Sequence, residues 1–144
     1  MPKSGYAFLP HTTDAYIEAV GATLEEAMQF AGMALTDTMC AIDSISPILT
    51  ERIEASGRDE ITLLYDWLET ILLRFDLNNK VYSRYKVAPL TRSPAGLHAS
   101  AEVSGEKYDR QKHGSKVEVK AVTYHKMEVV REERSTIVRF ILDL

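Results

Sequence analysis

Two segments of the chain carry apolar residues at the three- and four-residue spacing that is typical of amphipathic helices. The first begins at Thr23, where Thr23 and Glu26 form a capping box, and its apolar positions reach Met39. The second begins after Asp59, which can cap its first turn, and ends near Asn78. The pattern therefore predicts two main helices, each burying one face.

The rest of the chain shows the short apolar runs and the alternation of apolar and polar residues that indicate β-strands. The predicted strands cover residues 15–20, 48–55, 81–87, 97–104, 117–130 and 136–142. Residues 91–96, which include Pro94, are predicted to form a loop, and residues 106–115 a loop or a short helix.

The predicted elements follow one another in the order β-α-β-α-β-β-β-β. Helices alternate with strands only in the first half, which argues against a doubly wound parallel sheet. The fold class that we expect is α+β, with two main helices packed on a mixed, largely antiparallel β-sheet. A length of 144 residues is typical of one domain, so we expect a single domain over residues 1–144.

Composition and charge exclude several classes of protein. Apolar residues make up 45% of the chain and charged residues 26%, which is ordinary for a globular protein. The net charge of −4 provides no basic footprint for direct, tight binding of nucleic acid. The chain begins with no signal-peptide pattern and has no apolar run of membrane-spanning length, so we expect a cytoplasmic protein without a membrane partner.

The motifs of several common enzyme and metal-binding classes are absent from the sequence. There is no glycine-rich phosphate loop, no His-Glu-x-x-His, no paired Cys-x-x-Cys and no Gly-x-Ser-x-Gly. The single cysteine, Cys40, cannot form an internal disulfide. These absences argue against a nucleotide-hydrolysing loop, a structural zinc site and a serine hydrolase.

Two acidic positions near the chain ends are candidates for a metal site. His11 and Asp14 bracket a polar cluster in an apolar neighbourhood, although such a cluster is more often a turn. Asp143 is the penultimate residue of a predicted buried strand, and Leu144 adds the terminal carboxylate. If Asp14 met these groups, their repulsion would call for a cation, and carboxylate oxygens suit calcium, magnesium or manganese. A frayed, solvated chain end is the alternative that the spacing leaves open.

The predicted strand over residues 117–130 carries two further candidates. Alternation places His125 on the apolar face with Val119 and Met127, where a histidine is usually structural. Lys120 points to the opposite face and could neutralise a phosphate or nearby carboxylates, although a surface lysine is the ordinary interpretation.

Blocks of sequence in a fixed order resemble the archease family over nearly the whole chain. They are His-Thr-Thr-Asp at 11–14 with the helix start at 23–27, Gly-Glu-Lys-Tyr-Asp at 105–109 with Lys-His at 112–113, Val-Lys-Ala-Val-Thr-Tyr-His at 119–125, and Leu-Asp-Leu at 142–144. Leu-Tyr at 64–65 and Leu-Glu at 68–69 also fit. The chain departs from the family at Thr13, where alanine is more common; Asp14 is kept.

The resemblance implies a metal-binding accessory protein rather than a stand-alone enzyme. Archeases activate the RtcB-type RNA ligase that joins tRNA halves: they promote guanylylation of the ligase's histidine and multiple turnover, so tRNA is a partner only indirectly. The family's metal ligands carry over to Asp14, Asp143 and Leu144, with calcium the expected ion and magnesium or manganese as alternatives. Lys120 and His125 carry over as contributors to the same surface, and His11 takes a supporting role.

Two competing functions remain open from the sequence. The first is a metal-dependent phosphoester hydrolase or nucleotidyl-handling enzyme that uses Asp14, His11 and His125. The second is a chaperone-like module, which would bind its clients through apolar surface whether or not Asp14 and a metal are present.

Overall fold

The strands form two separate antiparallel sheets. The computed structural model describes residues 4–11 and 14–144. One sheet has the strand order β1-β2-β8-β7, and the other has the order β3-β6-β4, with β5 also paired to β6. The strands are β1 (Gly5–Leu9), β2 (Ala15–Gly21), β3 (Leu49–Gly57), β4 (Lys80–Val87), β5 (Thr91–Ser93), β6 (Gly96–Lys107), β7 (Ala121–Arg131) and β8 (Thr136–Asp143). The predicted α+β class is confirmed, but the expected single mixed sheet is replaced by two sheets in which every pairing is antiparallel.

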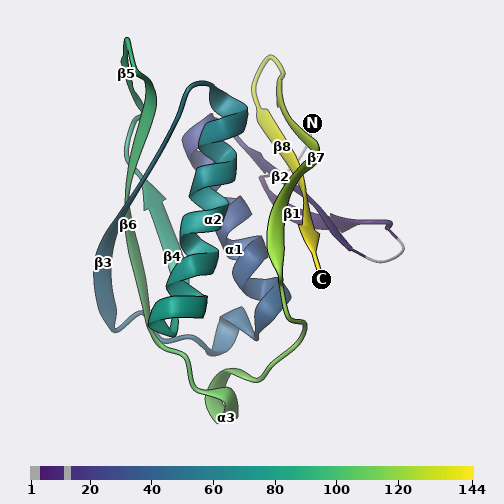
Figure 1. Cartoon of the computed structure of the whole chain (residues 1–144), viewed down its shortest axis with the longest axis vertical. Helices are drawn as coiled ribbons and strands as arrows, with labels where there is room; N and C mark the ends of the chain where they lie inside the picture. The colour runs from purple at the N-terminus through teal and green to yellow at the C-terminus, as the bar shows by residue number, and fades with distance from the viewer. Residues whose placement is uncertain (1–3, 12–13) are drawn as a thin grey trace.

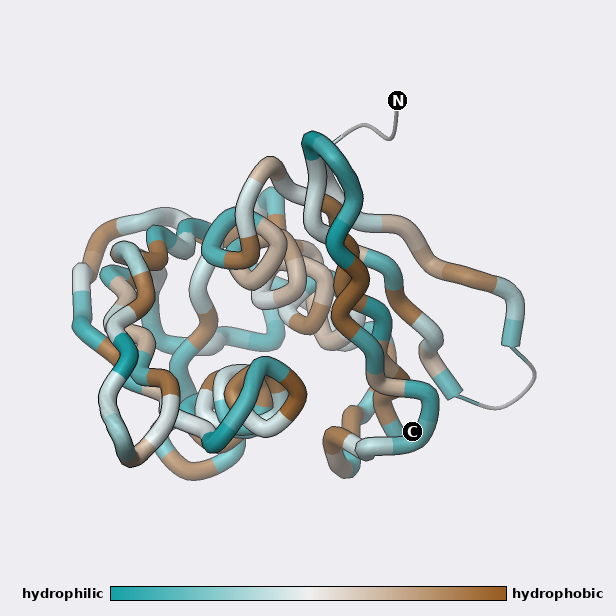
Figure 2. Tube along the Cα trace, turned by 90° about the horizontal axis from the view of Figure 1, so that it is seen from above, coloured by the Kyte–Doolittle hydropathy of each residue, from teal (hydrophilic) through white to brown (hydrophobic). Residues whose placement is uncertain are grey.

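The two long helices lie between the sheets (Figure 1). They are α1 (Leu24–Met39) and α2 (Glu60–Asn78), and two short helices, η1 (Ile42–Ser44) and α3 (Arg110–His113), connect other elements. α1 packs against β2 and β4, and α2 packs against β3 and β7. Seen from above, the helices separate two layers of strands (Figure 2). Within the described residues, no helix combines the length and the apolar composition needed to cross a bilayer.

Side-chain caps fix where the long helices begin, as the sequence predicts. The Thr23 hydroxyl accepts a hydrogen bond from the Glu26 N–H at 3.1 Å, and the Glu26 carboxylate accepts one from the Ala22 N–H at 3.0 Å. Asp59 and Thr62 form the equivalent reciprocal pair at the start of α2. These bonds satisfy N–H groups that have no partner inside the helix.

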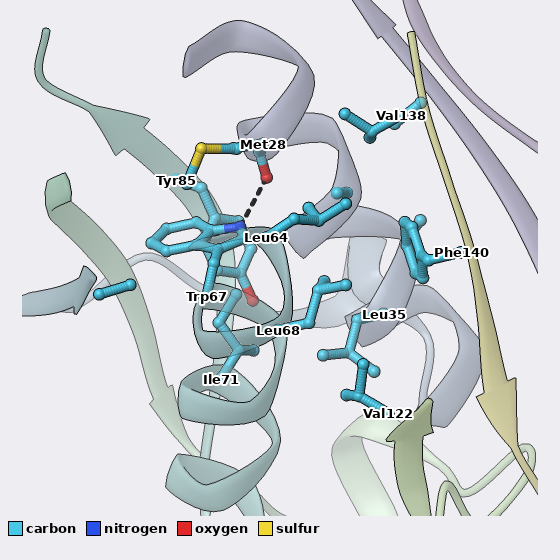
Figure 3. Close-up of a cluster of buried hydrophobic side chains, with 14 of the residues drawn as sticks. Met28, Leu35, Leu64, Trp67, Leu68, Ile71, Tyr85, Val122, Val138 and Phe140 are labelled. Atoms are coloured by element: carbon cyan, nitrogen blue, oxygen red, sulfur yellow. Dashed lines mark hydrogen bonds between the residues drawn. The ribbon is translucent and has the colours of Figure 1, made fainter. Parts of the chain in front are cut away.

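The core between the sheets is built around Trp67 of α2 (Figure 3). The Trp67 indole is fully buried, and its Nε1–H donates to the carbonyl of Met28 in α1 at 2.8 Å. The Tyr85 hydroxyl meets the Thr36 hydroxyl at 2.6 Å in the same interior. Among the described residues, no buried side-chain nitrogen or oxygen lacks a hydrogen-bond partner. These two bonds link α1 to α2 and to β4.

Three segments differ from the sequence prediction. β1 was not expected: it lies at the edge of its sheet and is half exposed, so its apolar pattern is weak. β5 occupies part of the predicted loop over residues 91–96. β7 begins at Ala121 rather than at residue 117, and its register with β8 shifts between Thr123 and Glu128, where Lys126 has a φ of 57°.

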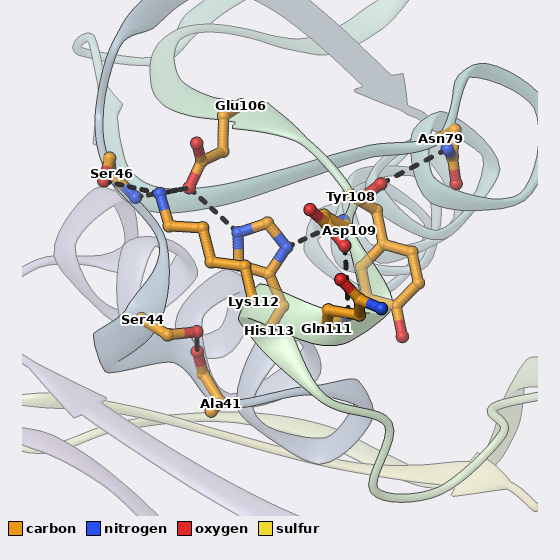
Figure 4. A network of polar contacts seen from close by, with 10 residues as sticks. All are labelled: Ala41, Ser44, Ser46, Asn79, Glu106, Tyr108, Asp109, Gln111, Lys112 and His113. Atoms are coloured by element: carbon orange, nitrogen blue, oxygen red, sulfur yellow. Dashed lines mark hydrogen bonds and ion pairs between the residues drawn. The ribbon is translucent and has the colours of Figure 1, made fainter.

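A compact polar network holds α3 against the rest of the chain (Figure 4). The buried His113 accepts the Asp109 N–H at Nδ1, so its proton lies on Nε2, which is 2.8 Å from a Glu106 carboxylate oxygen. That oxygen also binds the Lys112 ammonium at 2.7 Å and the Ser46 N–H at 2.8 Å. The network thereby fixes the path of the chain from β6 towards β7.

The network predicts a specific loss of stability in acid. Lys112, the Ser46 N–H and His113 lower the pKa of Glu106 from 4.5 to about 2. A carboxyl group whose pKa is lower in the folded state stabilises the fold fully above its unfolded pKa, and this contribution disappears as the pH falls through the folded pKa. We expect the free energy of unfolding to drop between about pH 4.5 and pH 2 and to drop less in Glu106→Gln. Urea unfolding at a series of pH values measures both slopes, and equal slopes would contradict the prediction.

Candidate functional site

The pairing of β2 with β8 places the predicted acidic residues at the same end of two neighbouring strands. Ala15 in β2 pairs with Leu142 in β8, and Asp14 and Asp143 are the next residues beyond that pair. Asp143 also pairs with Ala121 on its other side, and its carbonyl accepts the Lys120 N–H at 2.7 Å. The start of β2, the end of β8 and the start of β7 thus converge at one corner of the sheet.

A hollow of about 390 Å³ opens at this corner. Asp14 and Leu144 line it together with two charged residues that the sequence did not single out, Asp37 and Lys116. Its other walls are Phe8, Leu9, Ala15, Tyr16, Thr38 and Val117. The hollow is therefore lined by two acids and one lysine among mainly apolar walls.

Asp37 is held in place by partners from distant parts of the chain. The Lys116 ammonium donates to its carboxylate at 2.8 Å and to its backbone carbonyl at 2.9 Å, and the Tyr6 hydroxyl donates to the carboxylate at 3.1 Å. Burial, followed by the bond to Asp37 and its negative charge, raises the pKa of Tyr6 to about 12. An acid in the last turn of α1 opposes the helix dipole, which is the one signal in the sequence that could have pointed to a cationic partner.

The other predicted residues differ in how their contacts connect them to this corner. His11 Nδ1 lies 3.9 Å from an Asp14 carboxylate oxygen, and its ring packs edge-on against Tyr16. Lys120 is exposed and touches the site through its backbone bond to Asp143. Thr12 and Thr13, the middle of the predicted polar cluster, lie outside the described residues.

The predicted position of His125 is wrong. Strict alternation placed it on an apolar face, but His125 is exposed in the segment where β7 shifts register against β8. Its N–H donates to the Thr123 hydroxyl at 3.1 Å, and the next residue, Lys126, lies 5.7 Å from the centroid of the Tyr16 ring. Because the irregularity inserts extra residues into one strand, it breaks the period of two on which the prediction rested.

The donor set at the corner suits a hard cation only if the main chain contributes. Among the residues that the structure describes, no three His, Cys, Asp or Glu side chains converge to hold a metal ion. Asp14 and Asp143 carry carboxylates at this corner, and Leu144 lines the hollow together with Asp14. Oxygen donors of this kind fit calcium, which accepts carboxylates, carbonyls and water in a flexible shell.

Sequence comparisons point to one family. Residues 6–144 match the model of the archease protein family (MTH1598/TM1083). A protein archease from Methanopyrus kandleri is 35% identical over 136 residues, covering 94% of this chain and 96% of the relative. A protein archease from Methanothermobacter thermautotrophicus is 34% identical over 140 residues, covering 97% of this chain and 99% of the relative.

Two solved structures share the fold. The solution structure of Methanobacterium thermoautotrophicum protein 1598 has a TM-score of 0.82 and 33% identity, over 97% of this chain and 99% of that one. The crystal structure of an archease, possible chaperone, from Thermotoga maritima has a TM-score of 0.57 and 17% identity, over 100% of this chain and 98% of that one. The second likeness concerns the fold alone.

Proposed function

The chain belongs to the archease family, and on that basis we propose that it is a metal-binding accessory protein that activates an RtcB-type RNA ligase. In this role it promotes guanylylation of the ligase's active-site histidine and allows multiple turnover as tRNA halves are joined. It contacts tRNA only through the ligase, and it performs no turnover of its own.

The observation that supports the proposal is the pairing of Ala15 in β2 with Leu142 in β8, because Asp14 and Asp143 are the next residues beyond that pair. Asp14 and Asp143, together with Leu144, would hold the ion. Calcium is the ion of choice because the donors are all oxygens at strand ends, where water can complete the shell; magnesium and manganese are the alternatives. When bound, the ion would neutralise negative charge where the two proteins meet.

The walls of the hollow suggest how the chain would dock on the ligase. Phe8 and Val117 line the hollow with the charged residues and are 51% and 43% exposed, so they offer apolar contact next to the charged groups. The Lys116–Asp37 pair holds the segment before β7 against α1 and so keeps these walls in place. His11, Lys120 and His125 would add polar contacts around the same surface.

The competing hydrolase function has one observation in its favour, the position of His11 beside Asp14. A direct test offers the isolated chain a panel of phosphoesters and nucleotides with calcium, magnesium or manganese, and separately adds the chain to the ligase with GTP. We expect no turnover in the first experiment and faster guanylylation in the second. Metal-dependent turnover by the isolated chain that Asp14→Asn abolishes would instead establish the hydrolase.

Dependence on metal distinguishes the chaperone-like alternative from the proposed function. It predicts that the chain assists the ligase equally well with excess chelator and in Asp14→Asn, since apolar contact would suffice. We expect the stimulation to disappear under both conditions.

A further inference from the structure

The corner of the sheet that carries Asp14, Asp143 and Leu144 is called the acidic corner below. A second, larger hollow shares no lining residue with the hollow at that corner. It is a groove of about 640 Å³ at the N-terminal half of α2, between the β5–β6 hairpin and β7; Figure 1 shows α2 lying between these elements. A volume of this size accommodates a small organic ligand. Neither the metal site nor the resemblance to archeases accounts for it.

One wall of the groove is a stacked pair of tyrosines. The rings of Tyr65 in α2 and Tyr124 in β7 are nearly parallel, at 11°, with centroids 4.1 Å apart. Tyr65 covers one face of the Tyr124 ring, yet Tyr124 remains 51% exposed. A half-exposed aromatic ring with one face already occupied offers its other face to a flat ligand, and nucleobases stack on such rings.

Charged groups of both signs face the same groove. Asp66 and Glu69 lie on α2 beside Tyr65, and Arg58 lies just before the helix. Within residues 4–11 and 14–144, none of these three takes part in a salt bridge. Asp66 accepts only the Ser56 N–H, at 2.9 Å, so carboxylate lone pairs are left over for a ligand.

The Glu69 carboxylate belongs to the same wall as the tyrosine pair. Burial, followed by a hydrogen bond to Glu69 and its charge, raises the pKa of Tyr65. Glu69 lines the groove together with Tyr65 and Tyr124, so its carboxylate faces the space that a base stacked on Tyr124 would enter.

From this arrangement we propose that the groove binds a guanine nucleotide. The base would stack on Tyr124, and Glu69 would accept from the two neighbouring donors of guanine, N1–H and the N2 amino group. Asp66 would accept from ribose hydroxyls, and Arg58 would bind the phosphate. Adenine presents an acceptor at N1, which the Glu69 carboxylate would repel. The inference stands without the proposed ligase activation and needs no metal.

The test is isothermal titration of the intact protein with GMP, guanosine and AMP in the presence of chelator, so that the acidic corner is not involved. We expect GMP to bind at least about tenfold more tightly than AMP. Tyr124→Ala should weaken GMP about tenfold or more, the range for losing a stacking ring, whereas Tyr124→Phe should bind like the parent.

Two further variants assign the polar contacts. Glu69→Gln should reduce the preference for GMP over AMP, and Arg58→Ala should lower the affinity for GMP to that for guanosine while leaving guanosine unchanged. Glu133→Gln, an exposed acid outside the groove, is the matched control and should change nothing.

Several results would overturn the proposal. Equal binding of AMP and GMP, or unchanged GMP binding by Tyr124→Ala, would do so. The absence of GMP binding at millimolar concentration would also overturn it. Binding of N-acetyl-arginine amide in place of GMP would show that the acids and rings recognise a guanidinium group instead.

Discussion

Asp14→Asn and Asp143→Asn are each expected to abolish stimulation of the ligase while the protein still folds. Each change exchanges a charged ligand for a neutral amide of almost the same shape. Asp14 is only partly buried and Asp143 is exposed, so neither supports the core. Losing a hydrogen bond to a metal ligand already costs about 10- to 100-fold in metal affinity, and losing the ligand's charge should cost at least as much.

The measurement is the rate of ligase guanylylation with parent and variant at equal concentrations, together with calcium titration of each. Glu102→Gln is the control, because it makes the same exchange of carboxylate for amide on an exposed part of β6, away from the acidic corner. Unfolding curves of all three variants should coincide with that of the parent. If Asp14→Asn and Asp143→Asn stimulate the ligase as well as the parent, the assignment of the site is wrong.

Trp67→Ala is expected to have the largest effect on stability of any change considered. The indole is fully buried between the sheets and is bonded to the Met28 carbonyl. Removing a buried tryptophan costs about 3–5 kcal/mol through lost transfer free energy and the cavity left behind. For a protein of this size that corresponds to a fall in Tm of roughly 10–20 °C.

A graded series separates packing from hydrogen bonding at this position. Trp67→Phe keeps most of the apolar contact and loses the N–H, so it should cost less than Trp67→Ala. Leu77→Ala, at a position that is 75% exposed on the same helix, should change the free energy of unfolding by less than about 0.5 kcal/mol. Urea unfolding measures all three, and a loss below about 1 kcal/mol for Trp67→Ala would contradict the central place given to this residue.

The helices were predictable because their signals are local. Thr23 and Asp59 cap the helices that the sequence assigned to them, since a cap and its partner lie within one turn of each other. The division of the strands into two sheets was not predictable in this way. A strand's alternation shows that one face is buried, but it does not show which strand lies beside it.

The candidate site was predicted only in part, because the sequence does not show which strands lie side by side. The acids at positions 14 and 143 could be named from the sequence, but their meeting depends on the register of β2 with β8. Asp37 and Lys116 are 79 residues apart and meet only because the segment before β7 returns to the end of α1. The exposure of His125 depends on the shift of register in β7, and Lys126, with its positive φ, carries no sequence signal that marks it.

The two hollows divide the surface of the chain into separate regions. The acidic corner is formed where β2, β8 and the segment before β7 converge, whereas the groove lies over the N-terminal half of α2. Because the two share no lining residue, variants in one should leave the other unaffected. Glu69→Gln should therefore bind calcium like the parent, and Asp14→Asn should bind GMP like the parent.

The most direct measurement of the central claim counts ligation events. A limiting amount of the RtcB-type ligase is incubated with GTP and excess tRNA halves, with and without this protein, and joined tRNA is counted per ligase molecule. The account predicts several joined molecules per ligase when the protein is present with calcium, and about one or fewer when the protein is absent or carries Asp14→Asn. A yield that is the same with and without the protein would contradict the account.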